Sequence, residues 1–322
     1  MMSLEDLEVK WYVLIKKTAM FILPEFIIQK LFHFFIGKKR MLKLKEKIII
    51  YLEKGGSEAI IIDDNERLSI IENLKNISLV FPYTELVLPY GFVRKYNPKE
   101  INVFFDPESR MRYAIYAGEK IFFPKNFSVK EIRECVNDCL IYQDSESPHR
   151  YHDDGFYVEE GDVIADMGAA EGFWALLNAR KAKKIYLFEC DKKWSAALQK
   201  TFEPWKEKVE IIPKFISDTN TNDTTTLDEF VRKSGEINFI KADIEGAEIQ
   251  LLKGGVNTLS KQNNIKLLLC TYHKKNDAVE LEQILKSYGF MTGFSKGFMI
   301  MIWDRYLSPP YLRRGLIRAK KA

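Results

Sequence analysis

Short apolar segments alternate with stretches of helical periodicity from residue 162 to residue 303. This alternation constrains the fold more than any other feature, because neighbouring parallel strands need a long crossover connection, which is usually a helix. The pattern therefore predicts an α/β fold with a doubly wound, mainly parallel sheet. The expected strands span residues 163–166, 184–188, 209–212, 237–241 and 266–271. The expected helices lie near residues 173–180, 193–203, 227–234, 247–260 and 278–287.

Two regions flank this pattern. Residues 290–294 and 297–303 resemble two further strands, and the turn between them is too short for a parallel crossover, so the sheet should end in an antiparallel strand. Residues 99–150 contain short alternating strands, which indicates a small hairpin unit. We therefore expect an α+β N-terminal region ahead of the main domain. The expected parts are a helical region at 1–98, a β-hairpin and helix region at 99–150, and the main domain at 151–322.

The composition is that of a globular chain. Its 322 residues are 46% apolar and 29% charged, which suits about two domains. The net charge of +4 is too small for a protein that binds nucleic acid by neutralising phosphates. The four cysteines form no CxxC pair, and no stretch reaches the roughly 18 uncharged apolar residues of a membrane-spanning helix. We expect a cytoplasmic protein in a reducing compartment.

Both ends of the chain are basic. Residues 1–47 hold ten basic and five acidic side chains, and residues 305–322 hold six basic and no acidic ones. Two helices are expected within residues 4–36, interrupted at Pro24, and the second is apolar on nearly every side. Such a segment fits peripheral contact with the inner membrane face, burial in the protein's own core, or contact with a second copy in a homodimer. All three interpretations stay open, and solvated tails explain the basic ends equally well.

The first strand of the sheet runs directly into a glycine-containing turn. The strand ends at Asp166, and Gly168, Ala169 and Gly172 follow before the next helix. Glycine lets the backbone turn sharply beside a ligand at 168 and pack closely at 172. An acid at the strand end would repel a pyrophosphate but attract a cation, and S-adenosylmethionine carries ammonium and sulfonium cations. The turn therefore predicts a donor site of this kind, although ordinary strand-to-helix links share its composition.

The second and third strands end in polar groups that could contact the same donor. Glu189 follows the second strand, where a carboxylate accepts hydrogen bonds from the two ribose hydroxyls of a nucleotide. Ser217 and Asp218 follow the third strand and could face the adenine, but this pair is also common in ordinary turns. Ahead of the first strand, His149 and Arg150 could bind an anionic acceptor or only brace the linker.

The fourth strand leads into the most specific motif, which is Asp243-Ile244-Glu245-Gly246-Ala247-Glu248. At this motif the sequence resembles the FkbM family of S-adenosylmethionine-dependent methyltransferases, whose strand-end pattern is Asp-x-Glu-Gly-Ala-Glu. The resemblance covers about residues 147–303. One departure is Ala169-Ala170-Glu171, where the family more often has Ala-Asn-x, so an Asn side chain is missing from the donor site. Further matches occur in order at Asp166-x-Gly168, Phe188-Glu189, Thr226-Leu227-Asp228 and Tyr272-His273.

This resemblance implies a class I methyltransferase with a Rossmann-like sheet and a donor bound across the ends of the first two strands. It also implies a small-molecule or glycan acceptor, methylated on a sugar hydroxyl of a glycan, a lipid-linked saccharide or a secondary metabolite. Asp243 lies where donor and acceptor would meet, and His273 ends the fifth strand, so either is a candidate base for the hydroxyl proton. Glu248 is more readily explained as a solvated or helix-capping acid.

Other interpretations compete with a methyltransferase. An NAD-dependent Rossmann oxidoreductase would share the sheet, but the turn lacks GxGxxG and carries an acid. A non-catalytic, membrane-associated scaffold protein of glycan biosynthesis would not need Asp166, Glu189, Asp243 and His273 together. A divalent metal could bind Asp243 with His273 or Glu245, but the spacing is not a closed metal signature, so the sequence predicts no metal site.

Overall fold

The chain forms two compact units, divided between Tyr90 and Gly91. The two helices expected within residues 4–36 lie outside the described residues, and the expected membrane or dimer contact through them remains a prediction. The three-part division expected from the sequence likewise stays a prediction. The computed structural model describes residues 37–56, 62–79, 83–304 and 306–321.

The described residues of the N-terminal unit form helices. These are α3 (Lys38–Glu53), α4 (Asp64–Asn76) and α5 (Thr84–Val87). Helix α4 begins where the Asp63 side chain accepts a hydrogen bond from the Glu66 amide at 2.9 Å, which satisfies one of the free N–H groups of the first turn. No helix in the described ranges is both long and apolar enough to cross a membrane. Helices α3 and α4 pack together and bury Ile48, Leu52, Ile70 and Leu74.

The C-terminal unit begins with short 3₁₀ turns and a small antiparallel sheet. The sheet joins β1 (Val103–Asp106), β2 (Met111–Tyr116) and β3 (Glu119–Phe123) in sequence order, as the hairpin pattern predicts. Helix α6 (Val129–Tyr142) follows, and Ser128 and Glu131 cap its first turn reciprocally. The 3₁₀ turns are η2 (Gly91–Lys95) and η3 (Pro98–Glu100).

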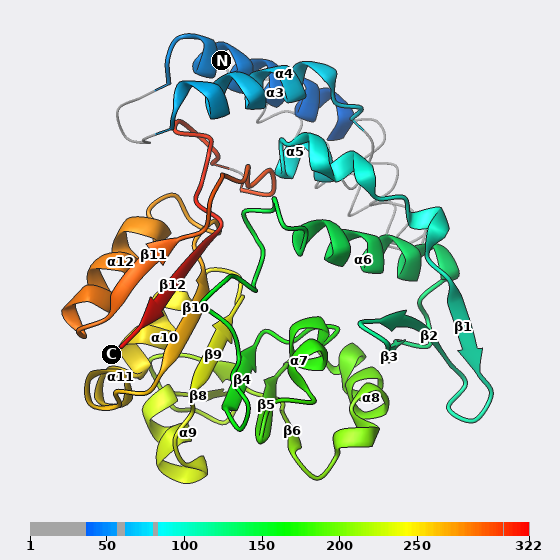
Figure 1. Ribbon diagram of the computed structural model, residues 1–322, viewed down its shortest axis with the longest axis vertical. Coiled ribbons are helices and arrows are strands. Elements are labelled where there is room, and N and C mark those ends of the chain that lie inside the picture. The colour runs from blue at the N-terminus through cyan, green and yellow to red at the C-terminus, as the bar shows by residue number, and fades with distance from the viewer. Residues whose placement is uncertain (1–36, 57–61, 80–82, 305, 322) are drawn as a thin grey trace, which may run out of the picture. The chain divides into compact units, whose positions relative to one another are not determined.

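The main sheet has seven strands in the order β11-β12-β10-β9-β4-β5-β6 (Figure 1). The chain runs outward from β4 to β6, then returns to β9 and continues outward on the other side to β10. This reversal of strand order makes the sheet doubly wound, and ligands bind such sheets beyond the carboxyl ends of the strands at the reversal point. The expected α/β Rossmann-like fold is therefore confirmed. The parallel strands are β4 (Val163–Met167), β5 (Lys184–Phe188), β6 (Val209–Ile212), β9 (Phe239–Ala242) and β10 (Lys266–Cys270).

The antiparallel end of the sheet is present, but one of its strands was misplaced by the sequence pattern. Strand β11 (Met291–Phe294) pairs with β12 (Leu316–Lys320), which lies antiparallel between β11 and β10. The expected strand at 297–303 is wrong, since Met299 makes only an isolated bridge to Arg313. The apolar side chains of this segment are buried in irregular backbone, whereas the true strand is short and partly basic and gives a weak strand signal.

Helices connect the strands and cover the sheet (Figure 1). Because of this cover, β4, β5, β9 and β10 are buried along nearly their whole length and consist mainly of apolar residues. The single helix expected at 247–260 is two helices that meet at Gly254 and Gly255. The remaining elements are α7 (Phe173–Asn178), α8 (Lys192–Thr201), η4 (Glu203–Trp205), β7 (Phe215–Ile216), β8 (Thr224–Thr225), α9 (Leu227–Ser234), α10 (Glu248–Gly254), α11 (Val256–Lys261) and α12 (Asp277–Ser287).

Candidate active site

A cavity of about 450 Å³ opens beyond the carboxyl ends of β4 and β9, at the point where the strand order reverses. Two sets of side chains line it. The first set, which we call the strand-end wall, comprises Asp166, Gly168, Ala169, Ala170, Glu171, Phe173, Trp174, Leu177, Lys241, Asp243 and Tyr272. The second set, which we call the α6 wall, comprises Tyr116, Cys135, Asp138, Cys139, Tyr142 and Gln143, and the linker residues His149 and Tyr151 complete the lining.

The glycines of the turn after β4 are required by close contacts. Gly168 has φ +75°, and a Cβ atom there would lie 1.9 Å from the carbonyl oxygen of Asp243. Gly172 has φ +82°, and its Cβ would lie 2.8 Å from the ring of Phe202, at the end of α8. The turn is therefore drawn tightly against β9, since any side chain at 168 would push the two strand ends apart.

The amides of this turn are already used within the protein. Gly168 and Ala169 both donate to the carbonyl oxygen of Phe188, at 3.0 and 3.1 Å. Ala170 donates to Glu189 Oε2 at 2.8 Å, and the other carboxylate oxygen of Glu189 accepts from the Asp191 amide at 2.7 Å. Glu189 thus holds the donor turn in place, and its own side chain does not line the cavity.

Asp166 and Lys241 form a buried ion pair on the strand-end wall. Their side chains are 1% and 5% exposed, and Lys241 Nζ lies 2.9 Å from Asp166 Oδ1. Lys241 also donates to the Gly168 carbonyl at 2.8 Å. Burial opposes the charge on Lys241, but the carboxylates of Asp166 and Asp243 outweigh it and raise the pKa of Lys241. A permanent positive charge therefore neutralises Asp166, whose Oδ2 has no hydrogen-bond partner among the described residues.

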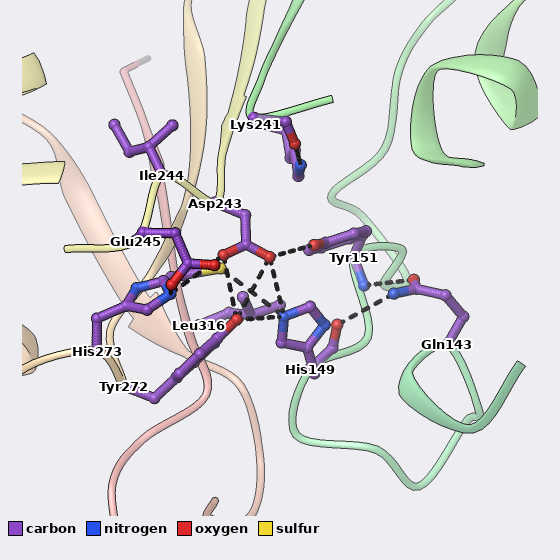
Figure 2. A network of polar contacts seen from close by, with 12 residues as sticks. Gln143, His149, Tyr151, Lys241, Asp243, Ile244, Glu245, Tyr272, His273 and Leu316 are labelled. Carbon is purple, nitrogen blue, oxygen red and sulfur yellow. Dashed lines mark hydrogen bonds and ion pairs between the residues drawn. The ribbon is translucent and has the colours of Figure 1, made fainter. Parts of the chain in front are cut away.

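Asp243 is the centre of a polar network at the end of β9 (Figure 2). Tyr151 donates to Asp243 Oδ2 and Tyr272 to Asp243 Oδ1, both at 3.1 Å. His149 Nε2 lies 3.5 Å from Asp243 Oδ2, and His273 Nε2 lies 3.4 Å from Asp243 Oδ1. Burial alone would raise the pKa of Asp243, but the His149 hydrogen bond and the charges of Lys241, His149 and His273 lower it strongly. Asp243 is therefore a carboxylate at neutral pH.

His273 contacts this network from outside the cavity. Its side chain is 5% exposed, it does not line the cavity, and its Nδ1 lies 3.3 Å from Glu248 Oε1. Burial would lower the pKa of His273, but Glu248, Asp243 and Glu245 raise it above the usual value. Both ring nitrogens thus face carboxylates, and Glu248, expected to be a solvated or helix-capping acid, is 1% exposed and holds the imidazole.

His149 contacts the same carboxylate from the cavity side. It belongs to the linker before β4. From the sequence, this histidine could either bind an anionic acceptor or only brace the linker. Its Nε2 lies 3.0 Å from the Tyr272 hydroxyl and 3.8 Å from the sulfur of Cys270. The rings of Tyr142, Tyr151 and Tyr272 surround the imidazole at centroid distances of 4.9 to 5.4 Å. The structure therefore places His149, one of the residues the sequence offered for acceptor binding or bracing, in the lining of the cavity.

The α6 wall was also missed. Cys135, Asp138, Cys139 and Tyr142 recur at the spacing of one helix face, and this periodicity was the available signal. Cys135 donates to Glu171 Oε1 at 3.1 Å, and burial raises the pKa of both Cys135 and Glu171. This face is therefore polar but holds no cation.

Ser217 and Asp218 lie away from the cavity. Ser217 donates its amide to the Thr225 carbonyl, and its hydroxyl lies 3.3 Å from the Asp218 carboxylate. The Ser217 carbonyl packs against Gly254, where a Cβ would lie only 2.1 Å from it. Neither side chain lines the cavity, so their contact with an adenine stays a prediction.

Residues 166–291 match the family model described as the methyltransferase FkbM domain. The resemblance inferred from the motifs is therefore confirmed, and this part of the chain is an FkbM methyltransferase domain. The matched range includes the whole strand-end wall as well as His273, whereas the whole α6 wall lies outside it. No curated protein matches the chain.

Several solved structures are similar to this chain. One is methyltransferase FkbM from Methylobacillus flagellatus KT, at 18% identity and TM-score 0.41, covering 61% of this chain and 56% of that one. Another is precorrin-6y C5,15-methyltransferase from Geobacter metallireducens GS-15, at 10% identity and TM-score 0.36, covering 51% and 82%. A third is SMU.1697c from Streptococcus mutans, solved in complex with SAH, at 14% identity and TM-score 0.33, covering 51% and 91%. This chain therefore spans just over half the length of the first of these structures.

Proposed function

We propose that this protein transfers a methyl group from S-adenosylmethionine to a hydroxyl oxygen on a sugar of a glycan, a lipid-linked saccharide or a secondary metabolite. One observation carries the proposal. Within the FkbM domain, the carboxylates of Asp166 and Asp243 line a single cavity on either side of the Gly168 turn. The first suits the cationic donor and the second suits the acceptor hydroxyl.

The donor side fits the chemistry of S-adenosylmethionine. Asp166 is 1% exposed, and its Oδ2 is without a hydrogen-bond partner in the described part of the chain, so an ammonium group would satisfy it. Lys241 beside it offers a positive charge to the donor's carboxylate. Glu189 holds the turn, and it would also accept hydrogen bonds from the ribose hydroxyls.

The acceptor side requires little more than position. The acceptor oxygen attacks the methyl carbon while the carbon–sulfur bond breaks, and the bonding pair returns to sulfur, which leaves neutral S-adenosylhomocysteine. The hydroxyl proton becomes very acidic as the new bond forms, so even a carboxylate of low pKa, such as Asp243, can accept it. Asp243 lines the cavity and is already ionised, which makes it the better of the two predicted bases.

His273 then acts through Asp243. Its raised pKa favours the protonated imidazole, and a protonated ring cannot take a proton from the acceptor. Held by Glu248 on one side, it places a positive charge 3.4 Å from Asp243 Oδ1. We propose that His273 is a positioning residue that orients this carboxylate.

The oxidoreductase alternative has less support from the same geometry. A pyrophosphate needs free amides at the turn after the first strand. Here the amides of Gly168 and Ala169 donate to Phe188, and that of Ala170 donates to Glu189.

Calorimetric titration tests the donor. We expect S-adenosylmethionine and S-adenosylhomocysteine to bind the full chain and NAD to show no heat of binding. Binding of NAD alone would support the oxidoreductase, and no binding of any of the three would contradict the proposal.

A second experiment separates an enzyme from a scaffold. S-adenosylmethionine labelled in its methyl group is incubated with the protein and with glycan, lipid and metabolite extracts of cells that lack it. We expect release of S-adenosylhomocysteine and one product that gains a single CH₂ unit by mass spectrometry. Binding of the donor without turnover in any extract would favour the scaffold.

A further inference from the structure

Three side chains of different chemistry converge beside the cavity. They are His149 from the linker, Asp243 from the end of β9 and Cys270 from the end of β10 (Figure 2 shows the first two). One ligand atom from each, an imidazole nitrogen, a carboxylate oxygen and the thiol sulfur, lies within 4.8 Å of the other two. His149 is 5% exposed and Cys270 is fully buried, so these atoms meet where water has little access.

The separations between these atoms are compatible with a shared cation. His149 Nε2 lies 3.5 Å from Asp243 Oδ2 and 3.8 Å from Cys270 Sγ, and the second distance is also within the range of a weak hydrogen bond to sulfur. Two ligands bound at about 2.0–2.3 Å to a tetrahedral zinc ion lie roughly 3.3–3.6 Å apart. The observed distances are close to this spacing, so one cation could bridge these atoms.

The donor types agree with the same cation. Imidazole nitrogen, thiolate sulfur and carboxylate oxygen are the three ligands that zinc takes in proteins. A thiolate and a carboxylate together neutralise a dication, so a buried site of this kind would carry no net charge. Burial raises the pKa of Cys270, and a bound cation would displace its proton.

The surroundings hold the carboxylate ligand in place. Tyr151 donates to Asp243 Oδ2 and Tyr272 donates to Oδ1, each at 3.1 Å, and hydrogen-bonded carboxylates are usual around bound metals. The Tyr272 hydroxyl lies 3.0 Å from His149 Nε2. His149, Asp243 and Tyr272 all line the cavity, so a cation there would be reachable by an acceptor hydroxyl.

A second group of potential ligands is less suitable. Asp243, Glu248 and His273 also lie within the same distance limit. Both nitrogens of His273 already face carboxylates, however, and Glu248 Oε1 accepts a hydrogen bond from the Ile244 amide at 3.0 Å. His273 Nδ1 and Glu248 Oε2 have no hydrogen-bond partner among the described residues, but neither side chain lines the cavity, so a cation held there would not be open to an acceptor.

We propose that His149 Nε2, Asp243 Oδ2 and Cys270 Sγ form a site for a zinc-like divalent cation with one coordination position open to the cavity. The site itself does not depend on the proposed methyl transfer. If both hold, the cation would contact the acceptor hydroxyl and lower its pKa as a Lewis acid.

Cobalt(II) is the probe for this site. The full chain is freed of metal by a chelator, kept reduced, and titrated with Co²⁺ and then with competing Zn²⁺. We expect one equivalent of Co²⁺ to produce a thiolate-to-cobalt charge-transfer band together with the visible bands of a four-coordinate ion, and Zn²⁺ to abolish both. A wild-type protein that shows no such band overturns the proposal.

Variants assign the ligands. We expect Cys270→Ser to remove the charge-transfer band and His149→Gln to weaken Co²⁺ binding at least tenfold, while Cys190→Ser and His152→Gln, which change residues that do not line the cavity, leave both unchanged. A band that persists in Cys270→Ser would overturn the assignment.

X-ray absorption of the zinc-loaded wild type covers the case in which a variant does not fold. We expect one sulfur at about 2.3 Å and nitrogen or oxygen ligands at about 2.0–2.2 Å. A first shell without sulfur would contradict the site. Neither measurement uses S-adenosylmethionine, so failure here leaves the proposed methyl transfer to its own titration.

Discussion

The two walls of the cavity differ in how their charges are arranged. On the strand-end wall, Asp166 is paired with Lys241, and Asp243 lies between two histidines and two tyrosines. Along α6, the wall presents thiols, phenols and Asp138, and no basic side chain. All of the first wall lies inside the FkbM domain match and all of the second lies outside it.

We therefore expect the two walls to have different functions. On the strand-end wall, charged groups are paired with opposite charges at fixed distances. Such preorganised charges are what binding of one donor and catalysis of one reaction would require. The α6 wall lies outside the FkbM domain match, and we expect acceptor preference to be decided there. Changes in the first wall should therefore affect donor binding or turnover, whereas changes in the second should leave the donor unaffected.

The largest effect should come from Gly168→Ala. The new Cβ would meet the Asp243 carbonyl at 1.9 Å and disfavour the φ of +75°. We expect a loss of about 3–5 kcal/mol in the free energy of unfolding, or no folded protein. Gly118→Ala is the matched control, because Gly118 has φ +82° but no atom within 4 Å of a new Cβ. It should cost about 1 kcal/mol in urea unfolding, and equal losses in both variants would mean that backbone strain alone matters.

The next effect concerns turnover. Asp243→Asn should lower the turnover rate by roughly 10² to 10⁴, because the amide can neither accept the hydroxyl proton nor balance His273. Affinity for S-adenosylhomocysteine should stay nearly constant. Glu245→Gln is the control, since Glu245 is 89% exposed and 3.8 Å from His273. Full turnover in Asp243→Asn would show that positioning alone suffices.

Donor affinity should respond to Glu189. Glu189→Ala removes the acceptor for the Ala170 amide and a contact for the ribose, so we expect S-adenosylmethionine to bind roughly ten- to a hundredfold more weakly, or about 1.5–3 kcal/mol. Asp191→Ala serves as the control, because it removes the cap of α8 and an exposed ion pair with Lys193 but leaves Glu189 in place. Unchanged calorimetric affinity in a folded Glu189→Ala protein would exclude this role.

The pKa values of two histidines should be shifted in opposite directions. Carboxylates raise the pKa of His273, whereas burial and then Lys181, Arg150 and Arg318 lower the pKa of His152 to about 4. NMR can resolve them, since the chain has four histidines. Similar midpoints for both rings would contradict this pattern.

The same shifts predict the pH dependence of stability. His152 favours folding above its unfolded pKa of about 6.5, and this contribution is lost as the pH falls toward about 4. His273 does the reverse, contributing fully below about 6.5 and losing its contribution as the pH rises through its raised pKa. Because solvent reaches part of the His152 ring, we expect only about 1–2 kcal/mol from it. Urea unfolding of His152→Gln at pH 7 and pH 4.5 measures this, and an unchanged difference from wild type at both pH values would refute it.

The smallest effect should come from the α6 wall. Tyr142→Phe removes only a hydroxyl, so S-adenosylhomocysteine affinity should stay within about twofold while the KM for the acceptor rises about two- to tenfold. Tyr157→Phe, at a residue outside the cavity lining, should change neither constant. A large loss of donor affinity in Tyr142→Phe would contradict the expectation that the α6 wall does not affect donor binding.

Much of the fold was predictable because its signals are local. Apolar periodicity located the five parallel strands to within a few residues, and the expected antiparallel end is present, although it is formed by β12 and not by the segment after the short turn. The strand at 297–303 failed because buried irregular backbone can carry the same apolar residues as a strand, whereas Leu316–Lys320 is partly basic. The pattern alone could not show which segment adds to the sheet, since strand pairing depends on distant partners.

The sequence by itself determined the strand-end groups. Asp166, Gly168, Glu189 and Asp243 each follow a strand, and strand ends meet at one edge of a parallel sheet whatever else the chain does. Only the tertiary structure decided their partners. Lys241 neutralises Asp166 because β4 and β9 are neighbours in register, and His149 reaches Cys270 across 121 residues of sequence. Such contacts depend on the order of strands in the sheet and on the packing of the linker. Neither of these produces a periodic pattern in the sequence.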